Sequence, residues 1–236
     1  MSSEPLRGAF GFLTVLPVRG NVTSASMLAF PLVGCAVGAG VGGIWLGAAS
    51  WWGAWIAACL ALATDLLLTG LLHIDGLADS ADGLLPPMGR ERRLEVMRLP
   101  DVGAFGVAIV AAVLLTRVAA LAQQKPSLGL VVALWCASRT AMAITPSLLP
   151  YARRDGLASR FVGAGLWPVY GVVLAAGIAW AAVGARGLTA VAAALVGGGL
   201  VALLGLRRLG GFTGDVLGAM GVVGETVGLV VAAGRW

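Results

Sequence analysis

The chain has 236 residues, of which 59% are apolar and only 11% are charged, and its mean hydropathy is +0.94. Soluble domains usually carry about 25% charged residues, so this chain has too little polar surface to face water on all sides. The net charge of +5 is compatible with nucleic-acid binding, but Lys and Arg also accumulate in the cytoplasmic loops of membrane proteins, and no basic run is interleaved with aromatic residues. We therefore expect no nucleic-acid partner and one integral membrane domain over residues 1–236 in a lipid bilayer.

The apolar stretches predict an all-α fold, a polytopic transmembrane helical bundle with about seven spans, each long enough for a hydrocarbon core of about 30 Å. Ahead of them, the apolar patch at 8–18 lacks a clear cleavage site and predicts an interfacial or partly inserted helix rather than a cleaved signal peptide. The segment at 90–100 predicts a short amphipathic helix on the cytoplasmic surface. The predicted spans cover residues 28–48, 52–72, 103–122, 129–149, 167–184, 188–206 and 216–233.

Glycine is abundant, at 36 residues. The runs at 34–43 and 196–200 place small residues at helical spacing, and neither is followed by the Lys-Ser/Thr pair of a phosphate-binding loop. Helices in lipid associate by close approach of their backbones, so both runs predict helix-packing faces.

Basic residues are distributed unevenly between the two sides that these spans define. Three basic residues lie on the side opposite the N-terminus and eleven on the N-terminal side. The positive-inside rule therefore predicts a multi-pass protein of the cell (inner) membrane, with the N-terminus and the loops at 73–102, 150–167 and 207–215 in the cytoplasm. The eleven are Arg7, Arg19, Arg90, Arg92, Arg93, Arg98, Arg153, Arg154, Arg160, Arg207 and Arg208.

An acidic segment, HIDGLADSADGLL at 73–85, follows the second predicted span. Asp75, Asp79 and Asp82 are spaced i, i+4 and i+7, so on a helix they lie within about 60° of one another. Three like charges on one stripe repel, and oxygen ligands without thiols or paired histidines favour Mg²⁺ or Mn²⁺. The spacing therefore predicts a divalent-metal site, although a solvated acidic loop is an alternative.

Four neighbours of this stripe are further candidates. Gly76 and Gly83 lie beside the carboxylates and would let a bulky phosphorylated substrate approach the backbone. His73, the only histidine, would point about 160° away from them on a continuous helix, which makes it a poor metal ligand. Asp101 precedes the third predicted span and is a candidate fourth carboxylate.

Apart from Arg117, three charged residues fall inside predicted spans: Arg139, Glu225 and Asp65. Charges within a membrane are costly and generally face a partner or a polar cavity. A pair of Arg139 with Glu225 or with Asp65 would satisfy them structurally, and a cavity reaching in from the cytoplasmic face would satisfy them functionally. The residues alone leave both interpretations open.

Two further segments carry candidate phosphate contacts. The loop at 151–161 includes Arg153 and Arg154, and guanidinium groups bind phosphate in a bidentate manner, although arginines are also typical of any cytoplasmic loop. Thr213 and Asp215 follow two glycines at the start of the last span. An ordinary helix N-cap would explain Asp215, and so would a phosphate or metal contact.

The motif HIDGLADSADGL at 73–84 is closely similar to the signature of the cobalamin synthase family, the adenosylcobinamide-GDP ribazoletransferases. The resemblance runs the length of the chain and includes FPLVG at 30–34, VGAFG at 102–106 and GGFTGDVLGA at 210–219. It implies a membrane-embedded enzyme in which α-ribazole or its 5′-phosphate attacks adenosylcobinamide-GDP and GMP leaves. An oligomer is compatible with it.

The resemblance also implies roles for the candidate residues. One or two Mg²⁺ ions would be held by Asp75, Asp79 and Asp82. The family's usual Asp-Ser pair is absent here, so either Asp101 is a displaced fourth ligand or the fourth carboxylate is dispensable. Asp82 would be the preferred proton acceptor and His73 the second candidate. The remaining positions, expected to contact substrate, are Gly76, Gly83, Arg139, Arg153, Arg154, Thr213, Asp215 and Glu225.

Two other functions are compatible with parts of the pattern. A phospholipid synthase of the CDP-alcohol phosphotransferase type shares the metal chemistry, but its Asp-x₂-Asp-Gly-x₂-Ala-Arg motif is not matched here. A secondary transporter would explain charges within the spans, but transporters often show internal repeats and none is visible in this sequence.

Overall fold

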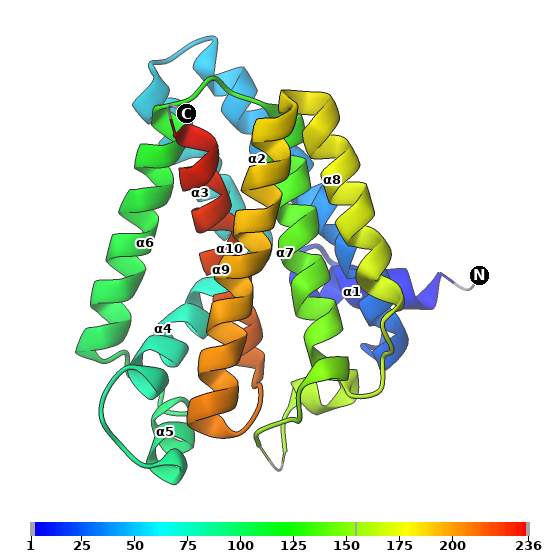
Figure 1. Ribbon diagram of the computed structural model, residues 1–236, viewed down its shortest axis with the longest axis vertical. Helices are drawn as coiled ribbons and strands as arrows, with labels where there is room; N and C mark the ends of the chain where they lie inside the picture. Colours follow the sequence, from blue (N-terminus) through cyan, green and yellow to red (C-terminus); the bar gives the residue numbers. More distant parts are fainter. Residues whose placement is uncertain (1–2, 154, 235–236) are drawn as a thin grey trace.

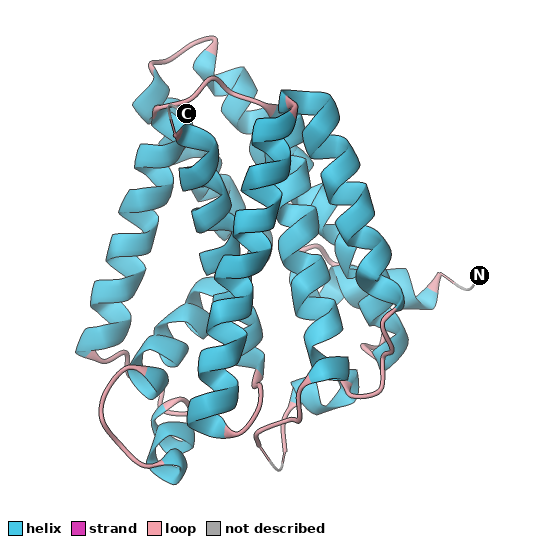
Figure 2. Ribbon diagram, in the orientation of Figure 1, coloured by secondary structure: helices cyan, strands magenta, loops and turns pink. Residues whose placement is uncertain are grey.

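The computed structural model describes residues 3–153 and 155–234, and within these ranges the chain is helical apart from its loops and one isolated bridge (Figure 2). The all-α prediction is therefore confirmed. The helices are α1 (Glu4–Leu13), η1 (Ser24–Ala29), α2 (Phe30–Ala49), α3 (Ala54–Thr69), α4 (Leu72–Leu84), α5 (Arg90–Val96), α6 (Ala104–Ala122), α7 (Leu128–Leu148), η2 (Leu157–Phe161), η3 (Trp167–Val169), α8 (Tyr170–Val183), α9 (Ala185–Leu209) and α10 (Gly214–Ala233).

The described helices fit a multi-pass membrane protein. Five are long and apolar enough to span a bilayer, namely η1 with α2, α6, α7, α9 and α10, and the count rises to six if the bent pair α3 and α4 is one span. The fifth predicted span, at 167–184, corresponds to η3 and α8, which together are shorter than the other spans. The prediction of about seven spans is thus matched only loosely.

The predicted span at 52–72 is interrupted before its end. Gly70 and Leu71 have φ angles of 57° and 62°, in the left-handed region, and the N–H of Leu71 donates to the carbonyl oxygen of Leu66 at 3.0 Å. This arrangement ends a helix with its last carbonyls satisfied. The chain then turns by 90° into α4, which we do not count as a span because it runs across the bundle axis (Figure 1).

Glycines allow the long helices to approach closely, as predicted for both runs. A Cβ atom at Gly38 of α2 would lie 2.8 Å from the Cα of Val132 on α7, and one at Gly198 of α9 would lie 3.1 Å from the carbonyl oxygen of Met220 on α10. A larger side chain would force these helices apart, which is the behaviour expected of a small-residue packing face.

The loops predicted to be cytoplasmic gather at one end of the bundle (Figure 1). That end contains α5, the segment between α7 and α8, and the turn between α9 and α10, whereas the turns after α2 and α6 lie at the other end. Helix α10 is central, because it packs against α9, α4, α7 and α6. Its N-terminal end, where α4 crosses it, positions the candidate site.

Candidate active site

Helix α4 crosses the first turns of α10 at backbone contact. A Cβ atom at Gly76 would lie 2.8 Å from the carbonyl oxygen of Asp215, and one at Gly218 would lie 3.3 Å from the Cα of His73. The space beside Gly76 is therefore filled by α10, and that beside Gly83 is filled by Met97, whose Sδ would be 2.6 Å from an added Cβ. Both glycines serve helix packing, which corrects the prediction that they leave room for substrate.

The crossing brings together carboxylates from two helices. The pKa of Asp79 is raised to about 7, chiefly by burial and then by the negative charges of Asp215 and Asp75, while the positive charge of Arg153 opposes the rise. Asp215 was predicted only as an isolated cap or contact. We call Asp75, Asp79 and Asp215 the acidic group.

Arg153 and Thr213 hold the α10 side of this group. The guanidinium Nη2 of Arg153 lies 2.6 Å from Oδ2 of Asp215 and donates to the carbonyl oxygen of Met97 at 3.1 Å. The hydroxyl oxygen of Thr213 accepts from the N–H of Val216 at 3.2 Å, so Thr213 is the N-cap of α10. The predicted contact residue Arg154 lies outside the described residues.

Asp82 lies close enough to raise the pKa of Asp79, as the helical stripe predicted, but both of its oxygens are engaged at α6. Its Oδ2 accepts from the N–H of Gly103 at 2.7 Å and its Oδ1 from the N–H of Gly106 at 2.9 Å. The carboxylate therefore caps the start of α6, where free N–H groups and the helix dipole favour a negative charge. Sequence periodicity could not show this contact, because it joins two separate helices.

The described residues contain no ready-made cluster of three or more His, Cys, Asp or Glu side chains that could hold a metal ion. Asp101 is exposed in the loop before α6, and it is not among the charges that shift the pKa of Asp79. The donor chemistry of the acidic group still fits a hard divalent cation, because three oxygen ligands repel one another there without one.

The charges within the spans pair with one another. Arg139 of α7 and Arg117 of α6 both form ion pairs with Glu225 of α10, and Arg117 also lies 3.0 Å from Asp65 of α3. The hydroxyl of Ser138 donates to Oε1 of Glu225 at 2.6 Å. The predicted pair of Arg139 with Glu225 is confirmed, and Asp65 pairs with Arg117 instead of Arg139.

These pairs tie four helices together and place Arg139 and Glu225 in the core rather than in an open substrate site. The sequence already showed Arg117 within a predicted span, and its depth was the signal that it needed an acidic partner. Its guanidinium also lies 5.1 Å from the ring centroid of Trp135, whose indole N–H donates to Asp65 at 2.8 Å.

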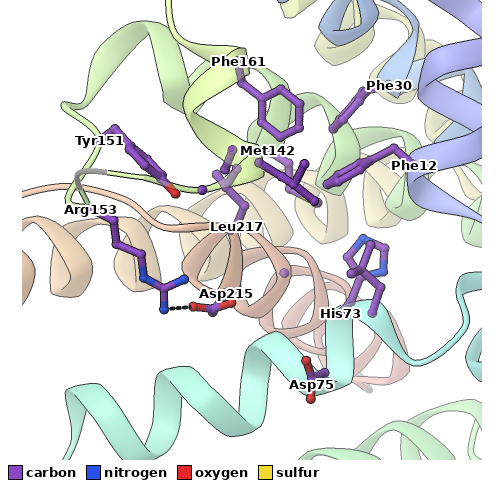
Figure 3. Close-up of a pocket in the computed structure, with 16 residues that line it drawn as sticks. Phe12, Phe30, His73, Asp75, Met142, Tyr151, Arg153, Phe161, Asp215 and Leu217 are labelled. Carbon is purple, nitrogen blue, oxygen red and sulfur yellow. Dashed lines mark hydrogen bonds and ion pairs between the residues drawn. The ribbon is translucent and has the colours of Figure 1, made fainter. Parts of the chain in front are cut away.

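His73 is buried, with 4% of its surface exposed, and neither ring nitrogen has a hydrogen-bond partner among the described residues. It lines a cavity of about 240 Å³ together with Asp75, Arg153 and Asp215. Figure 3 shows its ring and the carboxyl group of Asp75 projecting from α4 in different directions, as the helical spacing predicted.

Aromatic residues form the opposite wall of this cavity (Figure 3). Phe12 of α1, Phe30 of α2 and Phe161 of η2 line it from three segments that are distant in sequence. These phenylalanines were not among the predicted site residues. They come together only because α1 and the 151–161 loop fold onto the bundle.

Comparisons with known proteins identify the family of the chain. The family model described as cobalamin-5-phosphate synthase matches residues 5–233. Proteins named adenosylcobinamide-GDP ribazoletransferase from Bradyrhizobium diazoefficiens and Chlorobaculum tepidum are 39% and 37% identical to the chain. The first alignment covers 97% of this chain and 92% of the relative, and the second covers 94% and 91%.

A protein of the same name from Escherichia coli O157:H7 is 35% identical over 93% of this chain and 95% of its own length. No solved structure matches the chain. The chain therefore belongs to the cobalamin-5-phosphate synthase family and is a transferase of cobalamin synthesis.

Proposed function

We propose that the protein is an adenosylcobinamide-GDP ribazoletransferase that joins the activated corrinoid to α-ribazole, or to its 5′-phosphate, and releases GMP. The names of its relatives support this reaction. The structural observation that carries the proposal is a largely apolar cavity that is lined by Arg153 and by Asp75 and Asp215 of the acidic group. A diphosphate substrate needs cationic contacts, and a nucleoside acceptor needs an apolar one.

The reaction is a displacement at phosphorus. A ribose hydroxyl oxygen of α-ribazole forms the new bond to the phosphorus atom that remains on the corrinoid, the bond from that phosphorus to the GMP oxygen breaks, and the hydroxyl proton passes to a base. Such transfers depend mainly on alignment of the attacking and leaving oxygens and on neutralisation of phosphate charge. Arg153 is placed for phosphate binding if it exchanges its contact with Asp215 for the substrate.

One or two Mg²⁺ ions would be held by the acidic group and would neutralise charge on the diphosphate when bound. Asp75, Asp79 and Asp215 supply oxygen donors. The pKa of Asp79 is raised first by burial and second by repulsion from Asp215 and Asp75, and a bound cation would oppose both effects. Asp82 and Asp101 are weaker candidates than the sequence predicted, because Asp82 caps α6 and Asp101 is exposed.

His73 is the better candidate for the proton acceptor. Its ring nitrogens lack partners and it lines the cavity beside Asp75. Both oxygens of Asp82, the acceptor preferred from the sequence, accept backbone N–H bonds instead. Burial, and then the positive charges of Arg139 and Arg117, lower the pKa of His73 well below its usual range. The imidazole is therefore neutral and free to accept a hydrogen bond or a proton from a hydroxyl.

We place the site on the cytoplasmic side of the inner membrane. The acidic group lies at the end of the bundle to which the positive-inside rule assigns the cytoplasm. A reporter inserted between α4 and α5 should give a cytoplasmic signal, and a periplasmic one would reverse this orientation.

The central experiment is an assay of GMP release by the purified protein in detergent, from adenosylcobinamide-GDP and α-ribazole, with and without Mg²⁺. Asp75→Asn should remove Mg²⁺-dependent release, whereas Glu91→Gln, an exposed acid on α5, should retain it. Absence of GMP release by the unmodified protein contradicts the proposal. CMP release from a CDP-activated lipid and an alcohol would favour a phospholipid synthase instead.

A further inference from the structure

Phe12, Phe30 and Phe161 form an aromatic wall of the cavity, and phosphoryl transfer alone does not require such a wall. The ring centroids of Phe12 and Phe161 are 5.2 Å apart with an interplanar angle of 80°, and those of Phe30 and Phe161 are 6.0 Å apart at 74°. Edge-to-face contacts of this kind are favourable, and a further planar ring extends such a cluster in the same way.

The exposed fraction of each ring indicates which of them could contact a ligand. Phe30 and Phe161 are 0% and 1% exposed, whereas Phe12 is only partly buried. All three line the cavity. Phe12 is therefore the one of these three rings with surface left to contact a ligand, and it also lines a second cavity beside Val18 and Arg160.

His73 supplies an independent sign that the cavity takes a ligand. Buried polar atoms are almost always hydrogen-bonded, yet both imidazole nitrogens are buried without a partner in the described protein. The ring therefore needs a hydroxyl or similar polar group from a ligand, and it lies between the aromatic wall and the acidic group (Figure 3).

The size of the cavity selects between the two substrates. Pockets for drug-sized ligands span about 300–1,000 Å³, and this one measures about 240 Å³. A nucleoside with a bicyclic base approaches that size, whereas a corrin macrocycle carrying a nucleoside diphosphate is several times too large. The corrinoid substrate must then reach the acidic group from outside the cavity.

We propose that this cavity is the binding site of the acceptor nucleoside. The planar benzimidazole of α-ribazole packs against Phe12, and a ribose hydroxyl bonds to His73, which directs the sugar toward the acidic group. This inference rests on the transferase activity proposed above, and it adds the binding site of the second substrate, α-ribazole.

Phe12→Leu tests the aromatic contact, because it keeps an apolar side chain and removes the ring. The KM for α-ribazole should rise about threefold to tenfold, the range expected for loss of one aromatic pair. The KM for adenosylcobinamide-GDP should stay unchanged. Phe10→Leu is the matched control on the same helix, since Phe10 does not line the cavity, and Phe12→Tyr should restore the KM.

A binding measurement separates this inference from the proposed reaction. Equilibrium dialysis of labelled α-ribazole against the protein in nanodiscs, without the corrinoid, should show binding that Phe12→Leu and His73→Phe weaken and Phe10→Leu does not. Absence of binding to the unmodified protein, or equal binding by all variants, overturns the inference even if GMP is released. Loss of GMP release with this binding pattern intact overturns the reaction instead.

Thermal unfolding of each variant in detergent provides the folding control. Phe12→Leu should unfold within a few degrees of Phe12→Tyr, so that a difference between them in KM reports the ring. A rise in the KM for adenosylcobinamide-GDP alone in Phe12→Leu would place the corrinoid in the cavity and overturn the inference.

Discussion

Arg117 on α6 and Glu225 on α10 form an ion pair in which each side chain is only 1% exposed. Arg117 also reaches Asp65 on α3, at 3.0 Å. A single guanidinium thus neutralises two acids contributed by different helices in the interior of the bundle.

Arg117→Met should destabilise the protein strongly, because it leaves Glu225 and Asp65 with less compensation in an apolar interior. Removal of one partner from a buried pair costs about 3–5 kcal/mol, and the expected fall in Tm is about 6–20 °C for a chain of this size. Thermal unfolding in detergent measures it.

The matched control is Arg92→Met, which breaks a pair with Glu95 whose side chains are 62% and 65% exposed. Exposed pairs contribute about 0–1 kcal/mol, so this variant should unfold near the temperature of the unmodified protein. Similar Tm values for Arg117→Met and Arg92→Met would show that the buried network is not what holds α3, α6 and α10 together.

Asp82→Asn should lower stability where Asp75→Asn does not. The Asp82 carboxylate accepts two backbone N–H groups at the start of α6, and an amide retains only one acceptor oxygen without the charge. The expected loss is about 1.5–3 kcal/mol, the range for a hydrogen bond to a charged group. Metal-free thermal unfolding of both variants is the measurement, and equal Tm values would contradict the capping role.

The sequence predicted most of the helices because hydropathy reports length and apolar character directly. The predicted spans at 103–122 and 216–233 lie close to α6 and α10. The break after α3 was missed, since hydropathy carries no information on the left-handed φ angles of Gly70 and Leu71. Gly70 ahead of a polar segment was the available signal.

The candidate site was predicted in part for a related reason. Helical spacing correctly grouped Asp75 with Asp79, because both belong to one continuous helix. It also grouped Asp82 with them, although the N–H groups of Gly103 and Gly106 draw that side chain to α6. Contacts between elements of this kind depend on tertiary packing, which a single helical wheel cannot represent.

The stability of the metal-free protein should depend on pH through Asp79. Its pKa is raised to about 7 in the folded protein, from an ordinary value of about 3.9. Between these values the folded protein holds one proton more than the unfolded chain, so this group lowers stability as pH rises from about 4 to about 7. Above about pH 7 the ionised Asp79 carboxylate makes its full unfavourable contribution to the free energy of folding.

Asp79→Asn should therefore be more stable than the unmodified protein at pH 8 in EDTA, and the difference should vanish near pH 4. Thermal unfolding across this pH range measures it. Asp101→Asn is the control, because that acid is exposed and does not act on Asp79. A difference that grows toward acid pH would contradict the assignment of the raised pKa.

Mg²⁺ should stabilise the folded protein by binding to the acidic group. A ligand at 100 times its Kd that binds only the folded state contributes about 2.7 kcal/mol, so Tm should rise measurably when Mg²⁺ is added after EDTA treatment. Asp75→Asn and Asp79→Asn should each abolish most of this rise, because each removes a charged donor.

Asp101→Asn distinguishes the site that the structure favours from the one that family resemblance implies. If Asp75, Asp79 and Asp215 hold the ion, the rise in Tm persists in Asp101→Asn, because this exposed loop residue does not perturb Asp79. If the rise disappears, the loop before α6 must fold back when Mg²⁺ binds and bring Asp101 to the acidic group. A rise that survives in every aspartate variant would place the ion elsewhere and remove the acidic group from the mechanism.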